Sequence, residues 1–196
     1  AILDFDAAGK LKKNWEKPLL NRAAAWFALG DFKAANSDYQ SVLRLHPENS
    51  EATNGLGLIM QFGHDDPIGA EELYQKAILQ NPKNAGAWYN LAYLEAGRGH
   101  SVKAIDDFGQ AIRLDSNYVD AYLNRGLLQM QSNKPDLALV DFEFAAYRRP
   151  NDARVQTLLG WAQCATRSTM LGCLTLSKAK DLGAKDIDQL IRTYCK

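Results

Sequence analysis

The stretch AYLEAGRGHSVKAIDDFGQAIRLDS, residues 92–116, decides the fold because it contains the repeating unit of the whole chain. An apolar stretch leads into a polar break at residues 97–100, and apolar residues then return at helical spacing. Gly99 lies in the break, where a glycine commonly follows the end of a helix. The sequence therefore predicts two helices joined by a short turn.

The same order of features recurs in three further stretches, at residues 24–47, 57–82 and 127–150, with a period of about 34 residues. Three kinds of residue fix this period. The small residue near the start of the second helix is Ala35, Ala70, Ala104 and Ala138. The aromatic residue four positions later is Tyr39, Tyr74, Phe108 and Phe142. The residue that stops the helix is Pro47, Pro82, Ser116 and Pro150.

Each recurring residue has a physical role in a stack of helical hairpins. Small residues let two helices approach closely, and the aromatic residue fills the space between neighbouring hairpins. The residue before each new hairpin is a good N-cap, as Asn49, Asn84, Asn117 and Asp152 show. A hairpin of this kind cannot bury its apolar face alone, so the repeat predicts a solenoid of stacked hairpins.

These residues make the sequence similar to the tetratricopeptide repeat (TPR) family. The resemblance implies an all-α, right-handed superhelical solenoid of TPR helical hairpins. The repeat frames fall at residues 16–49, 50–84, 85–118, 119–152 and 153–186. Residues 1–15 match the second helix of a preceding repeat whose first helix is missing, so we expect this chain to be a fragment of a longer protein. Residues 187–196 are expected to form a C-terminal capping helix.

The fifth frame departs from the pattern, because Leu176 replaces the aromatic residue and Gly172 replaces the small alanine. Atypical end repeats are expected in solenoids. This segment resembles the closing segment of some bacterial TPR proteins. Cys173 and Cys195 flank the turn near Gly183, and antiparallel helices would bring them to similar heights. A disulfide between them and a pair of buried thiols both stay open at this point.

Composition excludes several functions. Lys plus Arg and Asp plus Glu both number 23, so no net charge attracts nucleic acid. No apolar run is long enough for a membrane span. Known catalytic and phosphate-binding motifs are absent, and no CxxC suggests a metal site. We therefore predict a protein that is not an enzyme and that needs no cofactor or metal. The compartment stays unknown.

In the TPR family, first helices line the concave inner surface, and the matching positions predict a peptide-binding groove here. Its candidate residues are Asn21, Phe27, Asn54, Leu58, Phe62, Tyr89, Asn90, Tyr93, Asn124, Leu127 and Trp161. The asparagines look like the asparagine ladder of O-linked N-acetylglucosamine transferase, because an amide can pair with any peptide backbone. The alternative is that asparagine is merely tolerated on a polar helix face. The aromatic residues are typical binding anchors, although core packing could account for some of them.

The predicted function is a non-enzymatic scaffold for protein–protein interaction that binds a peptide or helix in its groove. Some TPR co-chaperones bind the C-terminal carboxylate of a chaperone through basic residues, an arrangement called the carboxylate clamp. This clamp is not expected here, because the fifth residue of each repeat frame given above is not basic. A second hypothesis is a substrate-selecting arm of an enzyme whose catalytic domain lies outside this chain. A third is homo-oligomerisation through the groove or the open N-terminal edge.

Overall fold

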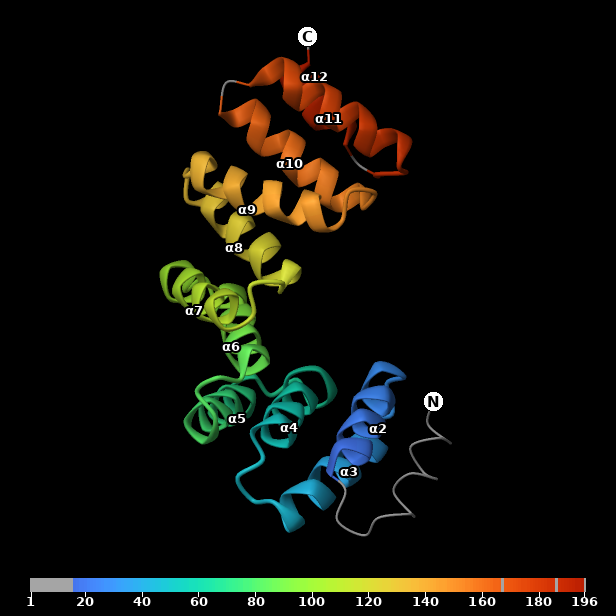
Figure 1. The fold of residues 1–196 in the computed structure, drawn as a ribbon, viewed down its shortest axis with the longest axis vertical. Coiled ribbons are helices and arrows are strands. Elements are labelled where there is room, and N and C mark those ends of the chain that lie inside the picture. The colour runs from blue at the N-terminus through green and yellow to red at the C-terminus, as the bar shows by residue number, and fades with distance from the viewer. Residues whose placement is uncertain (1–15, 167, 186, 196) are drawn as a thin grey trace. The chain divides into compact units, whose positions relative to one another are not determined.

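The computed structural model describes residues 16–166, 168–185 and 187–195, and every regular element in these ranges is an α-helix (Figure 1). The helix predicted at residues 1–15 lies outside the described residues. Among the described helices, none is long and apolar enough to cross a membrane. The chain divides into two compact units, residues 1–94 and 95–196, and the boundary falls inside α6.

The first unit contains two complete hairpins and the start of the next helix. Its helices are α2 (Glu16–Ala28), α3 (Phe32–Leu45), α4 (Ser50–Gly63), α5 (Pro67–Gln80) and most of α6 (Ala85–Gly97). Helix α2 packs on α3, and α4 packs on α5, while α2 and α4 also contact each other. First helices of successive hairpins therefore lie next to one another in this unit.

The second unit continues the same alternation. Its helices are the end of α6, α7 (Ser101–Leu114), α8 (Val119–Gln131), α9 (Pro135–Arg148), α10 (Ala153–Ala165), α11 (Thr169–Asp181) and α12 (Asp188–Tyr194). Helix α8 packs on α9 and α10 packs on α11, and α9 also packs on α10. The short helix α12 lies against α11 at the C-terminal end (Figure 1).

Glycines face the large buried side chains inside the hairpins. A Cβ atom at Gly57 would lie 2.5 Å from Cε1 of Tyr74, and one at Gly126 would lie 2.7 Å from Cε1 of Phe142. Both aromatic side chains are fully buried. The first helix of each of these hairpins therefore lacks a side chain at the point where the aromatic ring packs.

Two hairpins contain the same buried ion pair between their helices. Arg22 on α2 donates two hydrogen bonds to Asp38 on α3, at 2.7 and 2.6 Å. Arg125 on α8 donates two to Asp141 on α9, at 2.9 and 2.6 Å. Both pairs are separated by 16 residues, and both carboxylates are buried. This two-bond geometry fixes the pairing of the helices as well as neutralising the buried charge.

A chain of polar contacts joins neighbouring hairpins in the first unit. The side chain of Asn84 caps α6 by accepting a hydrogen bond from the backbone N of Ala87 at 3.0 Å. Its amide nitrogen also donates to the hydroxyl of Ser50 at 2.7 Å, and that hydroxyl donates to the carbonyl oxygen of Ala77 at 2.8 Å. The start of α4, the end of α5 and the start of α6 are thereby connected.

The C-terminal hairpin is packed more closely than an alanine at position 172 would allow. A Cβ at Gly172 would lie 2.8 Å from the backbone N of Cys164 and 2.8 Å from the carbonyl oxygen of Gly160. Leu176 occupies the aromatic position and is fully buried against Gly160. A glycine in place of the alanine therefore brings α10 and α11 together.

Candidate peptide-binding surface

The first helices of the first unit bring several predicted groove residues together. Asn90 on α6 donates a hydrogen bond through its side-chain nitrogen to Oδ1 of Asn54 on α4, at 2.9 Å. Both side chains are half-buried. This bond links equivalent helices of successive hairpins and aligns two amides on one surface.

Aromatic side chains lie along the same helices. The rings of Phe27 on α2 and Phe62 on α4 have centroids 6.2 Å apart in an edge-to-face arrangement. On α6, the rings of Tyr89 and Tyr93 are stacked with centroids 6.4 Å apart. Phe62 is 52% exposed and Tyr93 is 46% exposed, so both rings offer apolar area to a ligand.

Other predicted groove residues of the first unit differ in how accessible they are. Asn21 is exposed on α2, while Leu58, Phe27 and Tyr89 are half-buried. Leu58 also packs against the buried cluster around Tyr74, so core packing takes part of its side chain. The exposed part of the surface is therefore formed mainly by Asn21, Phe62 and Tyr93. The paired amides lie on the same helices as the two rings, Asn54 on α4 with Phe62 and Asn90 on α6 with Tyr93.

A small polar cavity of about 200 Å³ lies at the start of the same helices. It is lined by residues of α2 and α4 and of the two loops that follow α3 and α5, namely Glu16, Lys17, Leu20, Glu48, Asn49, Ser50, Glu51 and Asn81. Phe27 and Phe62 lie in the last turns of α2 and α4, at the opposite ends of these helices, so the cavity is separate from these two rings. Leu20 is the one apolar residue among those that line it, so the cavity offers hydrogen-bonding and charged groups.

Three predicted groove residues belong to the second unit. Asn124 and Leu127 lie on α8 and Trp161 lies on α10, and all three are half-buried. Helices α8 and α10 contact each other, as α2 and α4 do in the first unit. The structure thus repeats the arrangement of first helices, and Trp161 supplies the aromatic residue of that surface.

Sequence reasoning missed a buried glutamate with two basic partners at the start of the second unit. Glu95 is 1% exposed, lies 2.5 Å from Nδ1 of His100, and accepts a hydrogen bond from Nζ of Lys103. Burial raises the pKa of Glu95, but the hydrogen bonds from Lys103 and His100 outweigh that effect and leave the pKa below its usual value. The cluster therefore neutralises a buried charge at the α6–α7 turn.

The adjacent carboxylates Asp106 and Asp107 predict a solvent-facing side of the helix, and for Asp107 this prediction is wrong, because its side chain is buried. It occupies the position of Asp38 and Asp141 in its repeat, but Leu91 stands where those repeats have an arginine. Its side chain is buried, and Oδ2 has no hydrogen-bond partner in the described structure. Burial raises the pKa of Asp107 to about 6. The signal that could have found both the pairs and this exception is the 16-residue spacing between arginine and aspartate.

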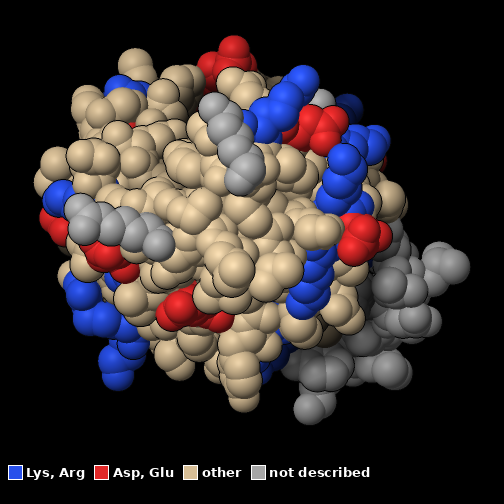
Figure 2. Space-filling model, turned by 90° about the horizontal axis from the view of Figure 1, so that it is seen from above, with Lys and Arg blue, Asp and Glu red and all other residues tan. Residues whose placement is uncertain are grey.

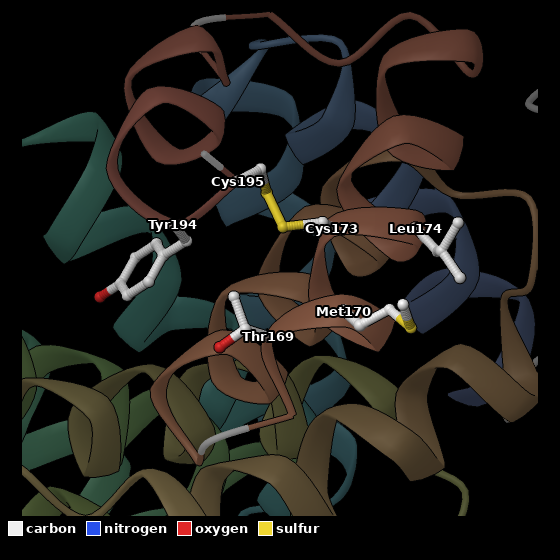
Figure 3. A pocket seen from close by; sticks show the side chains of 6 residues that line it. All are labelled: Thr169, Met170, Cys173, Leu174, Tyr194 and Cys195. Carbon is white, nitrogen blue, oxygen red and sulfur yellow. A yellow bond between two sulfur atoms is a disulfide. The ribbon is translucent and has the colours of Figure 1, made fainter.

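Of the two states left open for the terminal cysteines, the structure contains the disulfide, with the Cα atoms of Cys173 and Cys195 separated by 5.6 Å. A cavity of about 510 Å³ lies beside it, lined by Thr169, Met170, Cys173, Leu174, Tyr194 and Cys195 (Figure 3).

Figure 2 shows one face of the molecule, where acidic and basic side chains are interspersed around a mainly uncharged area. Neither sign of charge dominates this face.

Helical hairpins that pack aromatic rings on glycines and alternate with a constant period define the class of α-helical solenoid repeat proteins. Family models described as tetratricopeptide repeat match residues 20–60 and 73–106, and one described as TPR repeat matches residues 102–133. The chain belongs to the tetratricopeptide repeat family. The predicted all-α TPR solenoid fold is thereby confirmed, and proteins of this family typically mediate protein–protein interactions.

Several known proteins are similar to the chain. "DnaJ protein P58IPK homolog B" of Oryza sativa subsp. japonica is 28% identical over 179 residues, which cover 83% of this chain and 36% of that protein. "Probable UDP-N-acetylglucosamine--peptide N-acetylglucosaminyltransferase SPINDLY" of Hordeum vulgare is 31% identical over 120 residues, covering 57% and 12%. The crystal structure of MamA superimposes with a TM-score of 0.67 at 27% identity, covering 82% of this chain and 93% of MamA. The chain thus matches little more than a third of the first relative and about an eighth of the second.

Proposed function

We propose that the chain is a non-enzymatic scaffold that binds an extended peptide or a helix of a partner protein on the surface of its first helices. The observation that carries this proposal is the hydrogen bond between Asn54 and Asn90, flanked by the exposed rings of Phe62 and Tyr93. Membership of the TPR family supports the same function at a coarser level.

The amide pair suits a peptide backbone. A side-chain amide has two N–H donors and an oxygen with two lone pairs, and the bond between Asn54 and Asn90 uses one donor and one lone pair. The remaining groups can satisfy the N–H and C=O of an extended ligand whatever its side chains. Specificity would then come from Phe62 and Tyr93, since aromatic residues are the usual anchors of interfaces.

The test starts from peptides selected from a random displayed library against the 196-residue chain. Their dissociation constants are measured by calorimetry for the wild type and for the double variant Asn90→Ala and Tyr93→Ala. We expect binding to weaken at least about tenfold, because loss of an interface tyrosine alone costs about 1–2 kcal/mol. Helicity and melting should stay near wild type, because Tyr93 is exposed and Asn90 is half-buried.

The control is Leu79→Ala, which removes an apolar side chain that is 82% exposed, more than Tyr93, from α5, a second helix. Binding that survives the double variant, or that is lost equally in Leu79→Ala, would show that the surface is wrongly assigned. Light scattering of each sample separates ligand binding from self-association of the chain, which is the third hypothesis for the same surface.

A substrate-selecting arm is the second candidate, and the similarity to a protein named as a glycosyltransferase favours it. In that case the surface of α2, α4 and α6 would hold the protein substrate of a catalytic domain elsewhere in the polypeptide. Determining the full coding sequence tests it. A catalytic domain in the same polypeptide would favour the arm, and a polypeptide consisting only of repeats would exclude it.

A further inference from the structure

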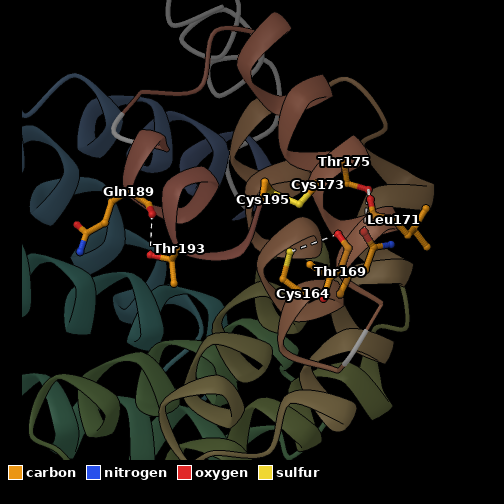
Figure 4. Close-up of a disulfide and its surroundings, with 9 residues drawn as sticks. Cys164, Thr169, Leu171, Cys173, Thr175, Gln189, Thr193 and Cys195 are labelled. Carbon is orange, nitrogen blue, oxygen red and sulfur yellow. Dashed lines mark hydrogen bonds between the residues drawn. A yellow bond between two sulfur atoms is a disulfide. The ribbon is translucent and has the colours of Figure 1, made fainter.

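We infer that the three cysteines of the α10–α12 segment form a thiolate site for a zinc ion once the disulfide is reduced. Their sulfur atoms all lie within 4.8 Å of one another. They come from three places in the chain: Cys164 from α10, Cys173 from α11, and Cys195 from the residue after α12 (Figure 4). The absence of a CxxC hid this cluster, because only the fold brings the three together.

The distances suit zinc after a small rearrangement. Zinc–sulfur bonds are about 2.3 Å long, so sulfurs sharing one ion lie about 3.8–4.0 Å apart. In the structure all three sulfurs already lie within 4.8 Å of one another, so Cys164 needs to move by about 1 Å at most. Cys173 and Cys195 are joined by a disulfide, whose sulfurs lie about 2.0 Å apart in any such bond, so after reduction they must separate by about 2 Å, which rotation of their side chains can supply.

Cys164 is already held towards the disulfide. Its side chain is buried, and its Sγ lies 4.0 Å from the carbonyl oxygen of Thr169, towards which the thiol donates. Gly172 has no side chain on the facing side of α11, and a Cβ there would collide with Sγ of Cys164. The glycine thus leaves the space in which the third sulfur reaches the other two.

A fourth ligand is available from the neighbouring cavity. Cys173 and Cys195 line this cavity of about 510 Å³, so water has access to the site from that side. Three protein ligands and one water are a usual set for zinc, and three thiolates favour a soft ion over magnesium or calcium. Met170 lines the same cavity and offers a thioether as an alternative (Figure 3).

The change from disulfide to metal site needs a reductant, which we take to be a dithiol. The dithiol gives two electrons and two protons to the Cys173–Cys195 bond and becomes a disulfide itself, leaving two thiols in the chain. Binding zinc then releases a proton from each coordinating thiol. The ion takes over the cross-link between α11 and the segment after α12, so the end of the solenoid stays closed in a reducing environment.

The test uses the 196-residue chain reduced with a phosphine, which takes oxygen from water to become a phosphine oxide and leaves free thiols. Zinc chloride alone is titrated against a chromophoric chelator. We expect one zinc per reduced chain and no comparable binding by the oxidised chain. Cys164→Ser should weaken zinc binding at least about tenfold, because it removes one of three ligands.

Cobalt substitution provides a second readout that counts the thiolates. The sulfur-to-cobalt charge-transfer absorption should fall by about a third in Cys164→Ser, because two thiolates replace three. Cys164 takes no part in the disulfide, so circular dichroism of the oxidised variant shows whether it still folds. Equal zinc affinity for reduced wild type and Cys164→Ser, or zinc binding by the oxidised chain, would overturn the inference.

Discussion

The α8–α9 hairpin and the α10–α11 hairpin occupy the same unit but are held together in different ways. In α8–α9 the ring of Phe142 fills the space above Gly126, and the Arg125–Asp141 pair joins the two helices. In α10–α11 the smaller Leu176 packs on Gly160, and Gly172 allows a closer approach. The disulfide between Cys173 and Cys195 then ties α11 to the residue after α12.

The difference follows from what lies on each side of the hairpin. The α8–α9 hairpin is covered by helices before and after it, since α7 packs on α8 and α10 packs on α9, so a large aromatic side chain is fully buried there. The last hairpin is followed by the short helix α12, which has no fully buried residue of its own. A covalent bond therefore holds a helix that contributes no buried residue of its own.

The largest expected effect on stability comes from removing the buried aromatic side chain of the α8–α9 hairpin. Phe142→Ala should lower the free energy of unfolding by about 3–5 kcal/mol, because it leaves a cavity where a fully buried ring was. Leu176→Ala should cost about 2–4 kcal/mol, because the removed side chain is smaller. Urea unfolding followed by circular dichroism gives both values. If Leu176→Ala lowered the free energy of unfolding more than Phe142→Ala, the α8–α9 hairpin would not depend more than the α10–α11 hairpin on a large buried side chain.

Removing the disulfide should affect the end of the chain and little else. Cys173→Ser together with Cys195→Ser opens a loop with a sequence separation of 22 residues, worth about 3 kcal/mol by loop-closure entropy. We expect faster hydrogen exchange in Asp188–Tyr194, because a helix of 7 residues is not stable alone. Exchange in α8 and α9 should stay unchanged, and a loss of protection there would contradict a local role for the disulfide.

A smaller effect on stability is expected at Asp107, which lacks the arginine partner that Asp38 and Asp141 have. Burial raises the pKa of Asp107 to about 6, so its ionisation above that pH destabilises the fold. The favourable contribution is present below the ordinary aspartate pKa of about 3.9 and is lost as pH rises through 6. Asp107→Asn should therefore raise stability at pH 8 by about 1–2 kcal/mol, and by less at pH 4.

The neighbouring aspartate is the matched control for this experiment. Asp106 is exposed on the same helix, so Asp106→Asn should change the free energy of unfolding by less than about 0.5 kcal/mol at either pH. Unfolding curves at pH 4 and pH 8 provide the measurement. A gain at pH 8 that is equal in both variants would point to general charge reduction instead of burial of Asp107.

The sequence predicted the helices and their buried contacts well because these depend on local, periodic signals. Tyr74 and Phe142 recur at a fixed spacing from small residues. The repeat position identified Asn90 and, one residue out of register, Asn54, and the structure joins these two by a hydrogen bond. The function of that surface stays a prediction. The resemblance to known repeats supplied the positions, and the physical pattern explains why those positions are small, aromatic or polar.

The remaining features could not be predicted, because each depends on contacts that no single repeat contains. The spacing of Cys173 and Cys195 allowed a disulfide but equally allowed two thiols, and nothing in it placed Cys164 beside them. Asp107 lacks the arginine partner of Asp38 and Asp141 because a leucine stands 16 residues earlier, in the preceding helix. Such long-range pairings need the packing of helices to be known.

The contacts of Asn84 have a consequence for anyone who recombines these repeats. The side-chain amide of Asn84 caps α6 and also binds Ser50, whose hydroxyl donates to the end of α5. These hydrogen bonds form a joint between two neighbouring hairpins, and residues from both hairpins are needed to complete it. A graft that joins foreign sequence immediately before residue 84 would inherit half of this joint and lose the other half. Splice points placed in the α2–α3 turn, at residues 29–31, leave Ser50, Ala77 and Asn84 on the same side of the junction and should give chimaeras that fold more often.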